Sequence, residues 1–270
     1  MKTKAPLLLV LVAAVALAVP AAGPGGNKNA LPTRVSGMLT VAVDIGVIGM
    51  AEGSILDGAV KDASGFEVDL ARALARRLGL DLRLVDVPFA RTFTAGAKPF
   101  DVAVSHVTIT AERAKSVDFS PPYFEVNKGV LLAPGVTAPA TLADLRKLRV
   151  CAQAATTSIR YVRKTLRPRL AAHSFPSTID VLRALSDGFC QAMVADLEIL
   201  VAAKRDAPDL YGAIAGQIVT SEHYGAVFEK GSRLRGPVDA ALQSLTRAGV
   251  VNRLATRWFG PGWNRVPVLR

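Results

Sequence analysis

The chain has 270 residues, 50% of them hydrophobic and 20% charged, which supports one well-packed globular unit or two smaller lobes. Lysine and arginine total 33 against 22 acidic residues, a formal net charge of +11. The arginines are scattered over amphipathic segments such as 70–79 and 246–260, without a basic run or interleaved aromatics. The charge therefore belongs to solvated helix faces, and no nucleic-acid partner is expected.

The first residues predict export from the cytoplasm. Two lysines precede an apolar run at residues 5–19, and small residues follow it, which is the layout of a cleaved signal peptide over residues 1–22. A retained membrane anchor is the alternative, but this run is shorter than the roughly 20 residues that span a bilayer. No cysteine follows the run. We therefore expect a periplasmic or secreted protein that is not a lipoprotein, with a linker over residues 23–36.

The first half of the mature chain alternates between strand and helix patterns. Residues 38–44 predict a buried strand that ends at Asp44. Residues 64–79 place apolar side chains four apart on one face of a helix that a glycine ends. Residues 80–87 and 100–107 predict two further strands. Strands separated by helices are typical of βαβ units with a parallel sheet.

The second half repeats this alternation of strand and helix patterns. Three expected helices begin at residues that can cap them, and two expected strands lie between them. These helices span 141–148, 156–166 and 177–188, and the strands span 148–153 and 190–196. Residues 223–232 and two further helices close the chain. The order favours an α/β fold with two halves, each built on its own sheet.

Polar residues follow several of the expected strands, which predicts a ligand cleft between the halves. In parallel α/β sheets, ligands bind beyond the carboxyl ends of the strands. Asp44, Asp196 and the loop from Ser105 to Thr110 all lie at such ends.

The residue types in this cleft suit a free amino acid. Arg113 could hold the carboxylate with two parallel hydrogen bonds, and Asp196 and Thr108 could accept from the ammonium. The helix that begins near Thr156 would add backbone N–H groups. The alternatives are that Arg113 pairs with an acidic neighbour at the surface, and that Asp196 only caps the next helix.

Three segments, residues 65–79, 101–124 and 224–260, resemble the bacterial solute-binding protein family 3, the polar amino-acid-binding components of ABC importers. The runs T-I-T-x-E-R-A-K and D-F-S-x-P-Y carry the resemblance. It implies a type II periplasmic-binding (Venus-flytrap) fold of two lobes joined by hinge strands within 124–129 and 220–225. Lobe 1 would be residues 37–125 plus 224–270, and lobe 2 would be residues 128–221.

The resemblance also implies roles for single residues. Arg113 matches the family's carboxylate-binding arginine, and Asp196 its ammonium-binding aspartate. A turn at residues 155–157 would donate to the carboxylate, and an aromatic shelf would lie under the ligand. The complete set of expected ligand residues is Asp44, Phe89, Ser105, His106, Thr108, Arg113, Thr156, Thr157 and Asp196.

The sequence departs from the family pattern at three positions. His106 stands where glycine or serine is usual, and its ring could face the ligand or turn into the lobe. Val47 lies near the usual place of an aromatic, and Ala155 replaces a glycine. Cys151 and Cys190 could form a disulfide or be two buried thiols. By resemblance to members with cysteines in the same strands, we expect the disulfide.

These features predict a binding protein that captures an amino acid or a related small zwitterion or carboxylate and delivers it to an ABC permease. We expect no chemistry on the ligand, no cofactor or metal, and a monomer. One rival is an enzyme on the same fold, resembling cyclohexadienyl or arogenate dehydratases, for which Glu198, Glu222 or His223 could act as the acid. Another is a ligand-sensing accessory protein.

Overall fold

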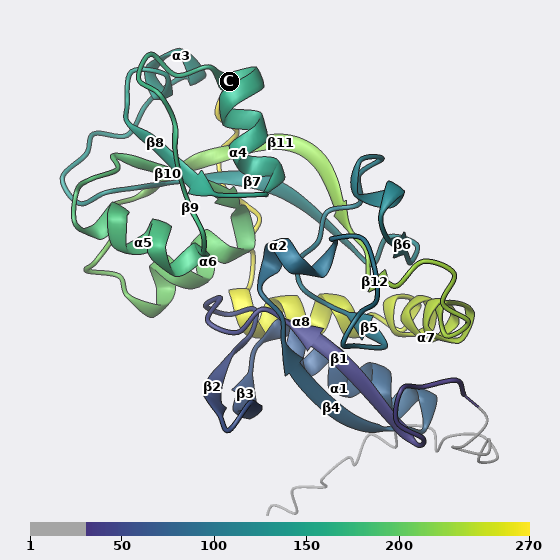
Figure 1. Cartoon of the computed structure of the whole chain (residues 1–270). Coiled ribbons are helices and arrows are strands. Elements are labelled where there is room, and N and C mark those ends of the chain that lie inside the picture. Colours follow the sequence, from purple (N-terminus) through teal and green to yellow (C-terminus); the bar gives the residue numbers. More distant parts are fainter. Residues whose placement is uncertain (1–30) are drawn as a thin grey trace, which may run out of the picture.

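The computed structural model describes residues 31–270, and these form two α/β lobes (Figure 1). The expected signal peptide and most of the expected linker lie outside the described residues. Within residues 31–270 no helix has the length and apolar character needed to cross a bilayer.

The first lobe is built on a five-stranded sheet in the order β4-β1-β5-β12-β6. β1 pairs in parallel with β4 and β5, as the alternating pattern predicts, whereas β12 is antiparallel to β5 and β6. Helices α1, α7 and α8 pack around one apolar core. The bounds are β1 Met38–Val43, α1 Phe66–Leu78, β4 Asp81–Asp86, α2 Phe89–Thr92, β5 Val102–Ala103, β6 Asp118–Phe119, β12 Val227–Phe228, α7 Arg235–Arg247 and α8 Val250–Phe259.

An antiparallel hairpin of β2 (Glu52–Leu56) and β3 (Ala59–Ser64) projects from the first lobe, and the sequence patterns did not predict it. Its residues are mostly exposed, so it lacks the apolar alternation that marks a half-buried strand.

The second lobe is a five-stranded sheet in the order β11-β7-β10-β8-β9. Three of its helices begin where expected, because the side chains of Thr141, Thr156 and Ser177 each accept a hydrogen bond from a first-turn N–H. The bounds are β7 Phe124–Leu132, α3 Leu142–Leu145, β8 Val150–Gln153, α4 Thr157–Tyr161 with a π-helical turn to Leu166, β9 His173–Phe175, α5 Thr178–Ser186, β10 Ala192–Asp196, α6 Leu197–Asp206 and β11 Ile214–Tyr224. The expected disulfide between Cys151 and Cys190 is present in this lobe.

Two long antiparallel strands, β7 and β11, run from one lobe into the other (Figure 1). Phe124 and Tyr224 lie in the core of the first lobe, while Leu131 lies in the core of the second. The register of the pair shifts between Ile218 and Glu222, at the crossing between the lobes. This arrangement matches the expected hinge.

The C-terminal segment crosses between the lobes as well. After α8 it lies beside β11, where the Gln217 backbone N–H donates to the Pro267 carbonyl and the Leu269 N–H donates to the Gln217 carbonyl. Leu269 is buried in a core cluster of the second lobe. The last residues therefore contribute to lobe 2, although the expected range 224–270 placed them in lobe 1.

Candidate functional site

A narrow cavity of about 20 Å³ lies between the lobes. Of the expected ligand residues, the first lobe contributes Phe89, His106, Thr108 and Arg113, and the second contributes Thr156, Thr157 and Asp196. Gln153, Thr178, Met193 and Ile199 also line the cavity, although no sequence signal singled them out.

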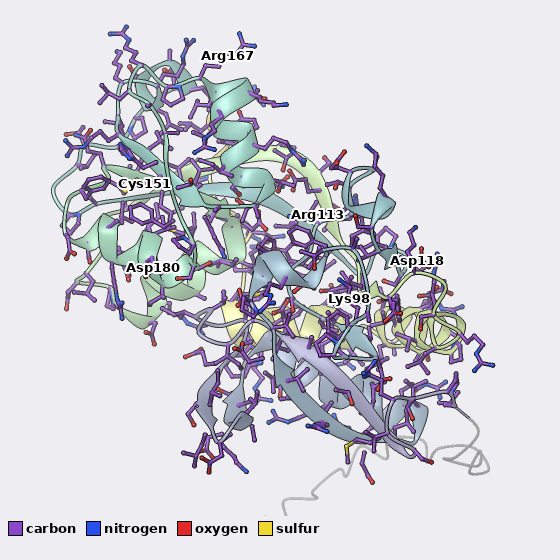
Figure 2. The ribbon with its side chains drawn as sticks, in the orientation of Figure 1. Lys98, Arg113, Asp118, Cys151, Arg167 and Asp180 are labelled. Atoms are coloured by element: carbon purple, nitrogen blue, oxygen red, sulfur yellow. A yellow bond between two sulfur atoms is a disulfide. The ribbon has the colours of Figure 1, made fainter. Side chains whose placement is uncertain are left out.

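Arg113 is fixed in the cavity wall by contacts to both lobes. It begins a short 3₁₀ turn, is 7% exposed, and lies where the two lobes face each other in Figure 2. One terminal nitrogen donates to the Thr108 carbonyl at 2.8 Å and the other to the Ala155 carbonyl at 3.0 Å. Its guanidinium also lies 4.2 Å from the ring centroid of Phe93 and 5.3 Å from that of Phe89.

The surface ion pairs considered for Arg113 do not form. Glu112 pairs instead with Lys115 at 2.9 Å, and Asp118 pairs with Lys230 at 3.0 Å. Burial lowers the pKa of Arg113 to about 10, so the guanidinium remains charged at neutral pH. Its two hydrogen bonds to carbonyls leave further N–H groups for a carboxylate.

Asp196 ends β10 at the cavity, and its side chain does not cap α6. Oδ1 contacts the Lys128 ammonium at 3.2 Å and the Ser158 hydroxyl at 3.5 Å, and Oδ2 accepts from the Tyr224 hydroxyl at 2.7 Å. Burial alone would raise the pKa of Asp196. The charge of Lys128 and the hydrogen bond from Tyr224 outweigh burial and hold this pKa below its ordinary value.

Lys128, in the crossing strand β7, is the main residue that sequence reasoning missed. It is 0% exposed and lies opposite Asp196 in the antiparallel register. Its ammonium donates to Thr157 Oγ1 at 2.8 Å and lies 3.1 Å from Glu222 Oε1, besides its contact with Asp196. A lysine directly before the apolar run Gly129–Leu132 was the available signal, because lysine is almost never fully buried unless paired.

Glu222, in the other crossing strand, joins the two lobes. Its Oε2 accepts from Thr108 Oγ1 of the first lobe at 3.1 Å and from Thr157 Oγ1 of the second at 2.6 Å. Beside these residues lies a second hollow of about 360 Å³, which shares both threonines with the cavity. The mouth of the cleft is therefore held together by the chain's own polar groups.

His106 lines the cavity while its ring is bonded into the first lobe. Nδ1 lies 3.3 Å from Glu67 Oε2, and the ring stacks on Phe89 with centroids 5.0 Å apart. Nε2 is buried without a hydrogen-bond partner among the described residues. Burial alone would lower the pKa of His106, but the charge of Glu67 and its hydrogen bond outweigh burial and raise this pKa above its ordinary value. The ring was expected either to face the ligand or to turn into the lobe. It lines the cavity and is also bonded to Glu67 of the first lobe.

The structure also shows the local environment of the three departures from the family pattern. His106 and Ala155 have φ angles of 41° and 61°, in the left-handed region that glycine adopts without cost. Val47 is buried in the core of the first lobe, and it does not line the cavity.

Glu198 and Asp196 share a single hydroxyl. Tyr224 Oη contacts Glu198 Oε1 as well as Asp196 Oδ2, but it has only one proton to donate. Burial and the neighbouring charge of Asp196 raise the pKa of Glu198 to about 8. At neutral pH Asp196 is therefore ionised, while Glu198 is a carboxylic acid with a proton of its own.

Asp44 and Ser105 do not line the cavity. The Ser105 hydroxyl donates to the Ala42 carbonyl at 3.3 Å, which fastens its loop to β1. Burial raises the pKa of Asp44 to about 6, and the Phe89 N–H bonded to it acts in the opposite direction. These two residues support the first-lobe wall of the cavity.

No cluster of histidine, cysteine, aspartate or glutamate side chains within residues 31–270 has the geometry of a metal site.

Residues 49–261 match the family described as bacterial extracellular solute-binding proteins, family 3. The chain belongs to this family. A similar protein, the arginine-binding extracellular protein ArtP of Bacillus subtilis (strain 168), is 27% identical over 259 residues, which is 94% of this chain and 97% of ArtP.

Solved structures of similar proteins confirm the two-lobed fold. An ancestral arginine-binding protein bound to glutamine superposes with a TM-score of 0.73 at 28% identity, over 84% of this chain and all of that one. An ancestral amino acid-binding protein, described as a precursor of cyclohexadienyl dehydratase, gives 0.70 at 26% identity over 83% of this chain and 96% of its own.

Proposed function

We propose that this solute-binding protein captures a small carboxylate-bearing solute, an amino acid or a close relative, in the cavity between its lobes. It delivers the solute in the periplasm to the membrane subunits of an ABC importer, and it works as a monomer. Similar proteins are described as binding arginine or glutamine, and those ligands share an α-carboxylate.

One observation carries this proposal, the buried and unpaired charge of Arg113. No carboxylate of the described residues lies within ion-pair distance of it, although its guanidinium is oriented by two carbonyls and two aromatic rings. A buried charge without a partner costs several kcal/mol. A ligand carboxylate in the cavity supplies that partner.

Replacing this arginine tests the proposal. We expect Arg113→Ala to weaken ligand binding by about 2–5 kcal/mol, at least about thirtyfold, because the ligand carboxylate loses its charged donor. The ligand is found first by a thermal-shift screen of refolded protein against L-amino acids, 2-oxo acids, 2-hydroxy acids and dicarboxylates. Calorimetry then compares the variants.

The control is Arg91→Ala, which removes an exposed arginine of α2 beside the same wall. It changes the net charge equally and should leave the affinity as it is. An Arg113→Ala protein that melts cooperatively and binds as tightly as the parent would remove Arg113 from the site.

Glu198 favours a second candidate function, that of an enzyme on this fold. A dehydratase needs a carboxylic acid that can give its proton to a leaving hydroxyl. Glu198 keeps its proton at neutral pH, follows the cavity residue Asp196 by two positions, and has a buried Oε2 without a partner among the described residues. Glu222 is engaged by Lys128 and two threonines instead, which makes it the weaker nominee.

The enzyme candidate is tested by incubating purified protein with prephenate or arogenate and following the aromatic product. Turnover that Glu198→Gln abolishes would establish an enzyme. Tight one-to-one binding with the ligand recovered unchanged would establish the transport component alone.

A further inference from the structure

We infer that Lys128 takes the place of a ligand's α-ammonium, and that this protein binds small carboxylic acids without an α-ammonium, such as 2-hydroxy and 2-oxo acids. The inference rests on the proposed function, because Arg113 must still hold the carboxylate.

The first step is that both oxygens of Asp196 already have donors. Oδ1 receives the ammonium of Lys128 and Oδ2 receives the hydroxyl of Tyr224. The aspartate that resemblance assigns to the ammonium is therefore already paired with a cation of the protein itself, which it shares with Glu222. A second ammonium at this carboxylate would stand next to the first, and like charges at short range repel strongly when water is excluded.

The second step is that the Lys128 ammonium cannot leave Asp196 without losing a hydrogen bond. An ammonium has three protons, and its three contacts to Thr157, Asp196 and Glu222 use all of them. Lys128 is fully buried, so leaving Asp196 would expose one N–H to no acceptor in a site that excludes water. A ligand ammonium could therefore bind Asp196 only if Lys128 were left with an unsatisfied N–H group.

The third step is that Thr108, the other expected acceptor, is engaged as well. Its hydroxyl donates to Glu222 Oε2, which also accepts from Thr157. Thr108 Oγ1 keeps its lone pairs and can still accept a hydrogen bond, but a neutral hydroxyl does not balance the charge of a ligand ammonium as a free carboxylate would.

The fourth step is the charge of the cavity wall. The charged lining residues include Arg113 and Asp196, and Asp196 is paired with Lys128, which also contacts Glu222. The imidazole of His106 lies in the same wall. The remaining lining includes a hydrogen-bonded Gln153–Thr178 pair and the side chains of Met193 and Ile199. Such a wall suits an anion with an uncharged body better than a zwitterion.

The test compares ligands that differ only at the α-carbon. Three matched sets are titrated into refolded full-length protein by calorimetry: alanine, lactate and pyruvate; leucine with its 2-hydroxy and 2-oxo analogues; and phenylalanine, phenyllactate and phenylpyruvate. In at least one set we expect the hydroxy or oxo acid to bind at least thirtyfold more tightly than the amino acid.

A substitution of Lys128 separates its role from general packing. Lys128→Met keeps an unbranched side chain that is shorter by the terminal nitrogen, and it uncovers Asp196 and Glu222, so the preference should shift towards the amino acid by at least thirtyfold. Lys128→Arg keeps the charge and should keep the preference for the acids. If Lys128→Met does not fold, the matched sets with the parent protein and Lys128→Arg decide the question.

The outcomes distinguish the two proposals. Tighter binding of the amino acid in every set that binds would overturn the inference and leave the carboxylate-binding function standing, because the ligand would then have displaced Lys128 from Asp196. No binding by any member, with Arg113→Ala equally silent, would overturn the proposed function and this inference together.

Discussion

Tyr224 illustrates how single buried protons organise this site. Its hydroxyl touches two carboxyls, its own pKa is raised well above the ordinary value by burial and by Asp196 and Glu198, and so it keeps its proton. The proton donated to Asp196 leaves Glu198 to carry another. Burial likewise raises the pKa of Asp44 to about 6. The native protein therefore binds more protons near neutral pH than its unfolded chain does.

A stability measurement can detect the proton on Glu198. Because its pKa rises from 4.5 to about 8 on folding, its contribution to the free energy of unfolding is present below pH 4.5 and is lost as pH rises to about 8. The loss is at most about 1.4 kcal/mol per pH unit. We expect Glu198→Gln to flatten this decline in denaturant titrations at pH 5, 6.5 and 8.

The matched control is Glu125→Gln, an exposed position on β7. It should retain the pH slope of the parent protein. His106 and Asp44, whose folded pKa values are also raised, act in the same direction and remain in every variant, so the slope is reduced by Glu198→Gln without vanishing. Equal slopes for the parent and Glu198→Gln would show that Glu198 is ionised in the native state.

At the scale of elements, α6 belongs to the second lobe but also contacts the first. Ala202 lies in the first-lobe core cluster, and the Arg205 guanidinium donates to the Trp258 carbonyl at the end of α8 at 2.6 Å. One close approach is at Gly49, where an added Cβ would lie 2.5 Å from the Ala202 Cβ. This contact requires the absence of a side chain.

Two glycines with nearly equal φ angles test that contact. Gly49 has φ 73° and Gly58 has φ 72°, but nothing lies within 4 Å of a Cβ built on Gly58. Both alanine substitutions should cost about 1 kcal/mol of stability for the left-handed conformation. Gly49→Ala should cost about 1–3 kcal/mol more, because α6 must move away. Equal losses in chemical denaturation would mean that α6 shifts without cost.

Local patterns predicted most of the elements and failed for identifiable reasons. The glycine after α1 and the hydroxyl caps of α3, α4 and α5 were correct, since capping depends on neighbouring residues alone. The β2–β3 hairpin has no buried face to impose a pattern, and β6 and β12 are two residues long, too short for a period.

The site shows the same limit. Residue type and resemblance assigned Arg113, Thr108 and Asp196 to one cavity, and all three line it. The partners of each residue, however, depend on strand pairings across the whole fold. Lys128 meets Asp196 because β7 and β10 are antiparallel neighbours, and it meets Glu222 because β7 also pairs with β11. Sheet order is set by the complete chain, so no local window contains this ion cluster.

At the scale of the molecule, the disulfide cross-links one lobe at a position away from the cavity. It closes a loop with a sequence separation of 39 inside the second lobe, and neither cysteine lines the cavity. We expect Cys151→Ala combined with Cys190→Ala to lower the free energy of unfolding by about 3–4 kcal/mol. The ligand affinity of the folded protein should change less than threefold, measured by calorimetry below the melting transition.

Reduction of the parent protein with dithiothreitol is the companion experiment, and it should reproduce the loss of stability without a mutation. A large loss of affinity in the folded double variant would show that the cross-link also shapes the cavity through β10, which ends at Asp196.

The crossing of the C-terminal segment places the two ends of the described chain on different lobes. The Arg34 backbone N–H is bonded to Asp101 in the first lobe, while the Arg270 carbonyl accepts from the Leu142 N–H in the second. Any rotation of one lobe against the other must change the separation of these ends. A pair of fluorescent proteins fused there would turn lobe movement into a change in energy transfer, and the chain could then serve as an optical sensor for its own solute.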